Sequence, residues 1–299
     1  MADLRLNQPT AAALAALSGM FVLGFTDNLV RVVAAEAGLW QFHAFRSAMV
    51  LVLLIGLALA GGAGLRLRSR RAVLSRSAAM GLAMAAYFGS LGLMPIGVAV
   101  AGFFTAPIFV LILSALVLGH RVGLWRWSAA VAGFAGVLMV IQPGSGSAGI
   151  VMLLPVAAGF LYAVTGILTR ATCDGEGTLV LTIGAFVAML LLGLTGLALL
   201  ALVPGLAGDG FLSRPYAPPG ARFLSYMAVQ ALGAMAGNWL LIRAYQLGEA
   251  SHVAIFEYAL MVFAGIWAYL LWGETVNMLA LAGMALIVLS GAVIAIRSR

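Results

Sequence analysis

The chain has 299 residues, of which 64% are hydrophobic and only 8% carry a charged side chain. A soluble domain carries about 25% charged residues, so this composition excludes a soluble enzyme and indicates an integral membrane protein. The net charge is +7 and every basic residue is arginine. Because these arginines gather at the edges of apolar stretches, we expect a lipid bilayer and not nucleic acid as the partner. The single Cys173 excludes an internal disulfide, and we expect no metal ion and no cofactor.

Apolar stretches about as long as a bilayer is thick fill most of the chain and predict ten membrane-spanning helices. The first stretch resembles a signal peptide, but it contains Asp27 and Arg31, and we interpret it as the first span. The longest link, residues 204–222, contains several prolines and predicts a surface loop. The expected spans are residues 11–33, 40–60, 77–95, 97–119, 126–142, 148–170, 178–203, 223–246, 250–272 and 276–296.

Arginine placement predicts how these spans are oriented. The largest group, from Arg66 to Arg76, lies between the second and third spans, and most other arginines fall on the same side of the membrane. Cytoplasmic loops carry an excess of basic residues, so we expect both termini to be cytoplasmic. We expect a multi-pass monomer in the inner (plasma) membrane of a bacterium.

The two halves of the chain resemble each other. Residues 107–121 and 261–275 are each a long apolar segment that ends in glycine and a polar residue, and each precedes a span rich in small residues. This similarity predicts one five-helix repeat at residues 1–142 and a second, inverted repeat at residues 148–299. Inverted repeats are typical of secondary transporters that open alternately to the two sides of the membrane.

Several residues carry a wider resemblance: Asn28 and Arg31 at the end of the first span, Arg46 early in the second, Pro107 in the fourth, and the pair Gly273-Glu274. With these residues the whole chain resembles the drug/metabolite transporter superfamily, specifically its ten-helix EamA-type members. Within that group it is most similar to the YddG-type exporters of aromatic amino acids. The resemblance implies an all-α membrane protein of two inverted five-helix repeats, in which helices 1–4 and 6–9 enclose a central cavity.

The function implied by the resemblance is the export of amino acids, aromatic ones favoured, and of similar small metabolites by alternating access. The alternative is a broad-specificity carrier of drugs or other metabolites from the same superfamily. A channel is less expected, because the spans contain only scattered polar residues and no continuous polar pore. An intramembrane enzyme is less expected too, because the charged residues form ion pairs without a nucleophile. We therefore expect a carrier of a small-molecule substrate with no catalytic residues.

Charged side chains inside spans are the strongest functional signal, because each costs roughly 2.5–3.5 kcal/mol to insert if it is unpaired. One group comes from the first two spans, in the outer half, and another from the eighth and ninth, in the inner half. Asp27 and Arg31 are four residues apart, which predicts an ion pair on one helix face. Each group is either a static set of ion pairs or part of a gate. The candidate gating or coupling residues are Asp27, His43, Arg46, Arg243 and Glu257.

Aromatic and amide side chains near mid-membrane are the candidate wall of the cavity. Their alternative role is packing against lipid or a neighbouring helix. An aromatic, weakly polar cavity suits flat substrates, which it would hold by stacking and cation–π contacts. Pro107 removes a helical hydrogen bond from the fourth span and predicts a kink there. The candidate substrate-binding residues are Tyr87, Phe103, Phe104, Tyr162, Asn238, Trp239 and Tyr258.

Overall fold

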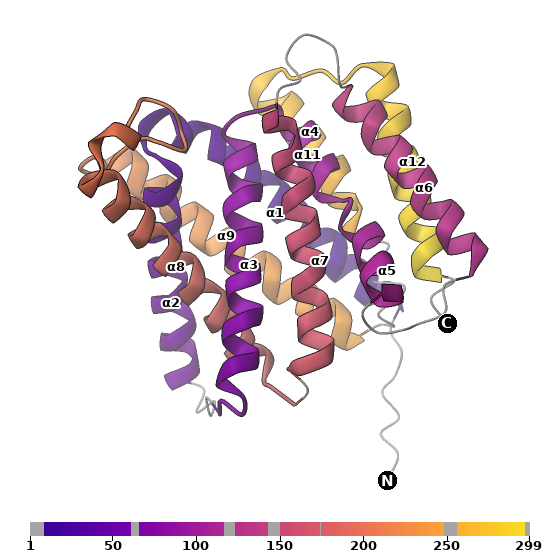
Figure 1. The fold of residues 1–299 in the computed structure, drawn as a ribbon, viewed down its shortest axis with the longest axis horizontal. Helices are drawn as coiled ribbons and strands as arrows, with labels where there is room; N and C mark the ends of the chain where they lie inside the picture. Colours follow the sequence, from indigo (N-terminus) through magenta and orange to yellow (C-terminus); the bar gives the residue numbers. More distant parts are fainter. Residues whose placement is uncertain are drawn as a thin grey trace.

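The computed structural model of the protein describes residues 9–60, 66–116, 123–142, 150–173, 175–247 and 256–296. Over those ranges every regular element is a helix, and the helices pack side by side into one bundle (Figure 1). In chain order the helices are α1 (Pro9–Glu36), α2 (Leu39–Ala60), α3 (Arg70–Leu91), α4 (Ile96–Phe103), α5 (Ala106–Leu116), α6 (Leu124–Ile141), the 3-10 turn η1 (Ile150–Leu153), α7 (Leu154–Thr172), α8 (Thr178–Leu202), η2 (Pro204–Leu206), α9 (Ala221–Leu247), α11 (Ala259–Trp272) and α12 (Met278–Ile296).

The prediction of an all-helical fold is confirmed over the described residues. Every expected span contains one of these helices, and the fourth contains two, α4 and α5. Residues 250–255, at the start of the ninth expected span, lie outside the described residues. The third helix begins earlier than expected, at Arg70, because the Ser69 hydroxyl accepts a hydrogen bond from the Ala72 N–H and caps the helix.

Five helical stretches of the described chain are long and apolar enough to cross a bilayer. They cover residues 10–36, 39–60, 96–113, 150–169 and 178–202, and shorter apolar helices lie within α6, α11 and α12. The helices α3 and α9 are long but less apolar, because they carry arginines and amides among their apolar residues. Polar side chains in long helices of such a bundle are expected to face its interior.

The kink expected near Pro107 is present as a break between two helices. The helix α4 ends at Phe103 and α5 begins at Ala106. Proline has no N–H to donate, and in an unbroken helix its ring would clash with the carbonyl four residues earlier. A break just before Pro107 is therefore expected. The Thr105 hydroxyl, inside the break, donates a hydrogen bond of 2.7 Å to the carbonyl of Gly102.

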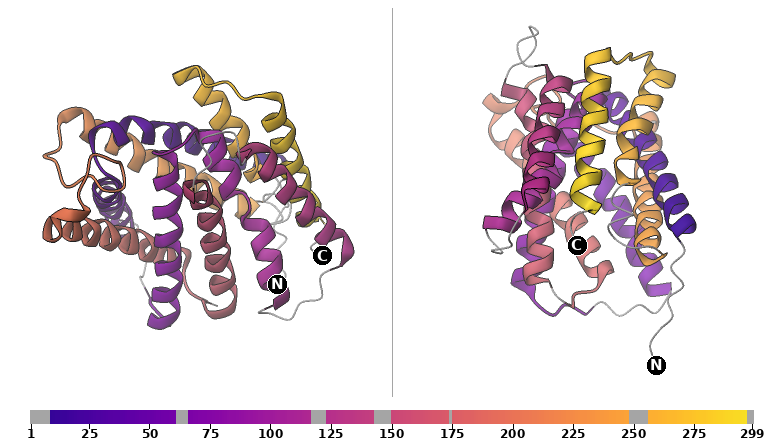
Figure 2. Two further views of the ribbon diagram at one scale, coloured as in Figure 1. Left: turned by 45° about the horizontal axis from the view of Figure 1, so that its top comes forward. Right: turned by 90° about the vertical axis from the view of Figure 1, so that its right-hand side faces the viewer.

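Helices from the two halves of the chain pack against each other throughout the bundle. The helix α1 packs on α9 and α11, α3 packs on α7 and α8, and α2 packs on α8. The pair α6 and α12 lies at one flank, as both the front and the turned views show (Figures 1 and 2). The main buried core joins apolar residues of α1, α2, α3, α4, α6, α7, α9, α11 and α12, so one core runs through most of the bundle.

Glycine lets α6 and α12 approach closely. A Cβ atom at Gly283 would lie 2.5 Å from the carbonyl oxygen of Gly136, and one at Gly136 would lie 2.7 Å from the carbonyl oxygen of Gly283. Both distances are shorter than any tolerated contact with backbone. Helices in lipid associate largely through such close packing. Lipid tails are as apolar as the helix surfaces, so the hydrophobic effect does not drive the helices together.

We therefore expect Gly283→Ala to destabilise the bundle, by about 1–3 kcal/mol as for other overpacked sites. The matched control is Gly56→Ala in α2, where an added Cβ would meet nothing within 4 Å. Thermal unfolding of the purified protein in detergent measures the difference. Equal unfolding temperatures for the two variants would contradict the close packing of α6 on α12.

Candidate functional site

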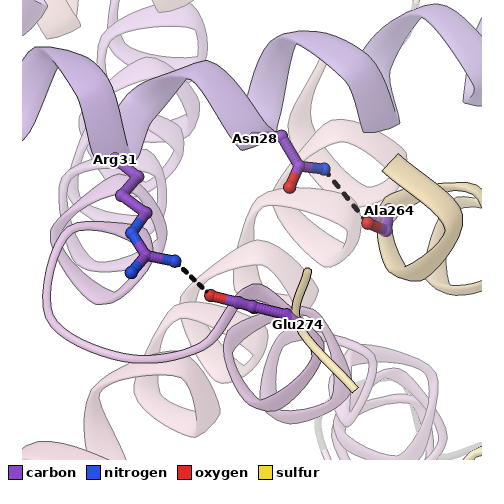
Figure 3. Close-up of polar contacts among 4 residues, drawn as sticks. All are labelled: Asn28, Arg31, Ala264 and Glu274. Carbon is purple, nitrogen blue, oxygen red and sulfur yellow. Dashed lines mark hydrogen bonds and ion pairs between the residues drawn. The ribbon is translucent and has the colours of Figure 1, made fainter. Parts of the chain in front are cut away.

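Polar contacts between distant segments close one end of the bundle, which we call the Glu274 end. The guanidinium of Arg31 in α1 pairs with the carboxylate of Glu274 after α11 at 2.5 Å (Figure 3). The Asn28 amide, also in α1, donates 3.0 Å to the carbonyl of Ala264 in α11. These two bonds hold α1 against α11.

The loop between α8 and α9 covers the same end. The Arg214 guanidinium donates to the carbonyls of Ala34 and Ala35 at the end of α1, at 3.0 and 2.9 Å. At the start of α9, the Arg222 guanidinium pairs with the Glu36 carboxylate at 3.0 Å. The end of α1 is therefore held both by the loop, through Arg214, and by the start of α9, through Arg222.

The expected ion pair between Asp27 and Arg31 is wrong. The Arg31 side chain is 59% exposed and reaches outward to Glu274, with its guanidinium 5.8 Å from the Trp272 ring centroid. Asp27 points to the interior and is 6% exposed. A spacing of four residues permits contact along a helix, but it does not require it. Here the long Arg31 side chain reaches instead to Glu274, in the link between α11 and α12.

A small crevice lies beneath this closure. It has a volume of about 20 Å³, and Asp27, Arg31, Trp272 and Glu274 are among the residues that line it. A cavity needs about 10–15 Å³ to hold one water, and a small-molecule site needs roughly 300–1,000 Å³. The crevice has room for about one water, so the Glu274 end is closed above Asp27 in this conformation.

Two buried groups of opposite charge, Asp27 and Arg46, lie at the centre of the site. The Tyr87 hydroxyl of α3 donates a 2.6 Å hydrogen bond to the Asp27 carboxylate. Arg46 of α2 is also 6% exposed and lies within electrostatic range of Asp27. Three helices thus bring a carboxylate, a phenol and a guanidinium together, and the neighbouring positive charge offsets part of the cost of burying Asp27.

Aromatic rings surround the Arg46 guanidinium. Its central carbon lies 4.4 Å from the Phe88 ring centroid, 5.6 Å from that of Phe42 and 6.0 Å from that of Phe186. The His43 ring lies edge-on to Phe88 at 5.7 Å. The guanidinium therefore has cation–π partners in place of the water that it loses on burial.

Five of the predicted substrate-binding residues form one continuous aromatic array. The ring centroids are 4.6 Å apart for Tyr87 and Phe103, 5.1 Å for Phe103 and Tyr162, 6.1 Å for Phe103 and Phe104, and 5.1 Å for Phe104 and Tyr258. These spacings are typical of interacting aromatic pairs. The array leads from the Asp27 carboxylate, through the break between α4 and α5, to the start of α11.

Two predicted wall residues lie apart from the array. The Asn238 amide donates 2.8 Å to the Ala234 carbonyl in its own helix, so the helix itself satisfies part of this amide. Trp239 is 60% exposed on the outside of α9. Neither the Trp239 ring nor the Asn238 amide contacts the five aromatic residues of the array.

The two inner candidates, Arg243 and Glu257, come from the second half of the chain. Arg243 is exposed near the end of α9, and Glu257 is half-buried next to Tyr258. Glu257 is within electrostatic range of Tyr162, at the far end of the aromatic array. A gating or coupling role for Arg243 and Glu257 stays a prediction.

Sequence reasoning missed Gln230 of α9, which is fully buried beside the site. Its amide nitrogen donates 2.5 Å to the carbonyl of Thr26, next to Asp27. The signal was available, because a glutamine in the middle of an apolar helix is costly to expose to lipid. Over the described residues, no three His, Cys, Asp or Glu side chains come together in a way that would hold a metal ion.

The bond between Tyr87 and Asp27 makes a measurable prediction. Tyr87→Phe leaves the buried carboxylate with one partner fewer, and a hydrogen bond to a charged group contributes about 1.5–3 kcal/mol. We expect Tyr87→Phe to lower the free energy of unfolding by this amount in the native background, and by much less in an Asp27→Ala background. A double-mutant cycle of thermal unfolding in detergent measures the coupling, and additive effects would contradict the bond.

Comparison with known proteins places this site in a family. A sequence model of the EamA-like transporter family matches residues 10–142 and 148–296. A solved crystal structure superposes with a TM-score of 0.65 at 17% identity, covering 95% of both chains, so the fold is shared.

The relatives with named functions include a riboflavin transporter and a pseudopaline exporter. The riboflavin transporter of Rhizobium johnstonii is 28% identical over 262 residues, which are 84% of this chain and 80% of that protein. The pseudopaline exporter CntI of Pseudomonas aeruginosa is 25% identical over 282 residues, which are 94% of each chain. These names support transport, but they do not support the narrower resemblance to aromatic amino-acid exporters. The family match over nearly the whole chain means that this protein belongs to the EamA-like transporter family and is a membrane transporter.

Proposed function

We propose that this protein is a secondary carrier that moves a flat, aromatic small metabolite across the membrane by alternating access. The observation that carries the proposal is the aromatic array from Tyr87 to Tyr258, which begins at the buried Asp27 carboxylate. Aromatic side chains bind planar molecules with little demand on their exact chemistry, and a buried polar centre at one end would fix the orientation of such a molecule.

The proposal includes ten membrane spans in two inverted repeats, residues 1–142 and 148–299, with both termini cytoplasmic in a bacterial inner membrane. Arginine placement supports this orientation. The helix pairs also support it, because α1 packs on α9 as α3 packs on α7, a reciprocal pattern expected of related halves. In this orientation the Glu274 end faces the outside, and the described conformation is closed to that side.

The contacts that close the Glu274 end are weak enough to open. Arg31–Glu274 and Arg222–Glu36 are ion pairs with partly exposed side chains. Exposed ion pairs contribute about 0–1 kcal/mol each. A substrate that binds the outward-open state modestly more tightly can therefore shift the equilibrium from the closed state to the open one, as an alternating carrier requires.

Two substrate classes fit the array, and each has its own support. A relative named as a riboflavin transporter favours a large flat ring system. The opposite charges of Asp27 and Arg46 favour an aromatic amino acid, whose ammonium and carboxylate would complement them. Both classes share the planar ring that the aromatic array would bind.

The test uses the purified protein in liposomes with labelled riboflavin, tryptophan, phenylalanine and leucine. We expect saturable uptake and counterflow of at least one aromatic compound, well above empty liposomes, and little uptake of leucine, which has no ring to stack. Phe103→Ala should lower the affinity for the transported compound about tenfold, because base-like stacking contributes about 1–3 kcal/mol per ring.

The matched control is Phe134→Ala in α6, which removes an exposed ring on the flank of the bundle. Leucine uptake equal to that of the aromatic compounds would contradict the aromatic specificity. Flux that does not saturate would indicate a channel, and conversion of the substrate would indicate an enzyme.

A further inference from the structure

Three polar side chains on one face of α2 are buried with hydrogen-bonding atoms unused. His43, Arg46 and Ser47 are three and four residues apart, so they lie side by side on the helix. His43 and Ser47 are each 1% exposed, and Arg46 is 6% exposed. Neither ring nitrogen of His43, nor Nε of Arg46, nor Oγ of Ser47 has a partner among the residues that the structure describes.

This pattern is unusual for packing alone. A buried polar group left without a partner costs about 1–3 kcal/mol, and roughly 90% or more of such groups in proteins are satisfied. The neighbouring carboxylate of Asp27 does have a hydrogen-bond donor, the Tyr87 hydroxyl. Among the described residues, four of the ten buried side-chain atoms without a partner lie on this face of α2, and the amide oxygens of Asn28 and Gln230, near Asp27, are two of the others. The face of α2 is thus the largest group of such atoms, and it lies in the polar centre of the bundle.

The chemistry of the three groups selects what they would bind. A guanidinium nitrogen can only donate, a neutral imidazole has one donor nitrogen and one acceptor nitrogen, and a hydroxyl can donate. The set is rich in donors and carries a positive charge at Arg46. It therefore suits oxygen atoms that accept hydrogen bonds, and anionic oxygens most strongly.

The position of these groups links them to the aromatic array. The Phe88 ring lies 4.4 Å from the Arg46 guanidinium carbon and 5.7 Å from the His43 ring centroid. The same ring lies 5.3 Å from the Tyr87 ring, where the array begins. Phe88 thus packs against both the start of the array and the polar face of α2, so the two features adjoin each other through one ring.

We propose that His43, Arg46 and Ser47 form a subsite that binds the acceptor oxygens of an aromatic substrate. This inference rests on the proposed function and deepens it, because it names the chemical group that sets specificity. Those oxygens belong to a carboxylate in an aromatic amino acid, or to ring carbonyls in a flavin. The shared chemistry is an acceptor oxygen attached to, or close to, a planar ring.

The experiment measures equilibrium binding to the purified full-length protein with tryptophan, tryptamine and riboflavin as probes. Tryptamine keeps the ring of tryptophan and lacks its carboxylate. The variants are Ser47→Ala and His43→Phe, which remove polar atoms without a partner and preserve most of the packing volume. The matched control is Ser290→Ala in α12, because Ser290 is also buried with an unused hydroxyl but lies on the α6–α12 flank.

We expect Ser47→Ala and His43→Phe each to weaken binding of the oxygen-bearing probe about five- to tenfold, as the loss of one hydrogen bond does. Tryptamine binding should change less than twofold, and Ser290→Ala should change nothing. A selective loss for tryptophan identifies a carboxylate, and a loss for riboflavin identifies ring carbonyls. Unfolding temperatures of all variants are measured alongside, so that a folding defect is recognised and the milder Ser47→Ala decides.

The outcomes separate the two proposals. Wild-type binding of tryptophan or riboflavin with unchanged affinity in both α2 variants overturns the subsite and leaves the carrier proposal standing. An equal loss for tryptamine also overturns it, because the lost contact would then be to the ring. A wild-type protein that binds none of the three probes overturns both proposals.

Discussion

The structure depends on how opposite charges are kept inside a bundle whose outer surface is apolar. An ionised side chain in such surroundings is costly unless charge and hydrogen bonds compensate it. Asp27 receives the Tyr87 hydroxyl at 2.6 Å and lies within electrostatic range of Arg46, which in turn lies over the Phe88 ring. The helices α1, α2 and α3 must therefore meet at one place, and that place is where the aromatic array begins.

The closure of the Glu274 end follows a different physical rule from the centre. Its ion pairs are partly exposed and individually weak, whereas Asp27 and Arg46 at the centre are both buried and would be costly to leave without compensating charge. The proposed alternating access requires such a difference, because one end of the bundle must open while the buried centre stays together. Phe104, in the break before Pro107, and Tyr258, at the start of α11, have ring centroids 5.1 Å apart, so the broken helix of the first half of the chain meets α11 within the array.

Sequence reasoning predicted the helices well, because apolar stretches of bilayer length and proline leave strong local signals. It also named five aromatic residues that prove to be in contact, since large rings within inner spans tend to face one another. It failed for contacts between segments that are distant in sequence, such as Arg31 with Glu274, because residue spacing along one helix does not predict which side chains of another segment lie within reach. Trp239 lies on the outside for a similar reason: the rotation of α9 depends on its packing against α1.

The most direct test of the account asks whether the Glu274 end must open during transport. Arg31→Cys and Glu274→Cys are introduced together, with Cys173 replaced by serine, and joined by a short, reducible bifunctional thiol reagent. We predict that cross-linking stops saturable uptake into liposomes, that reduction restores it, and that neither single-cysteine variant responds. Full transport by the cross-linked protein would contradict alternating access through this end of the bundle.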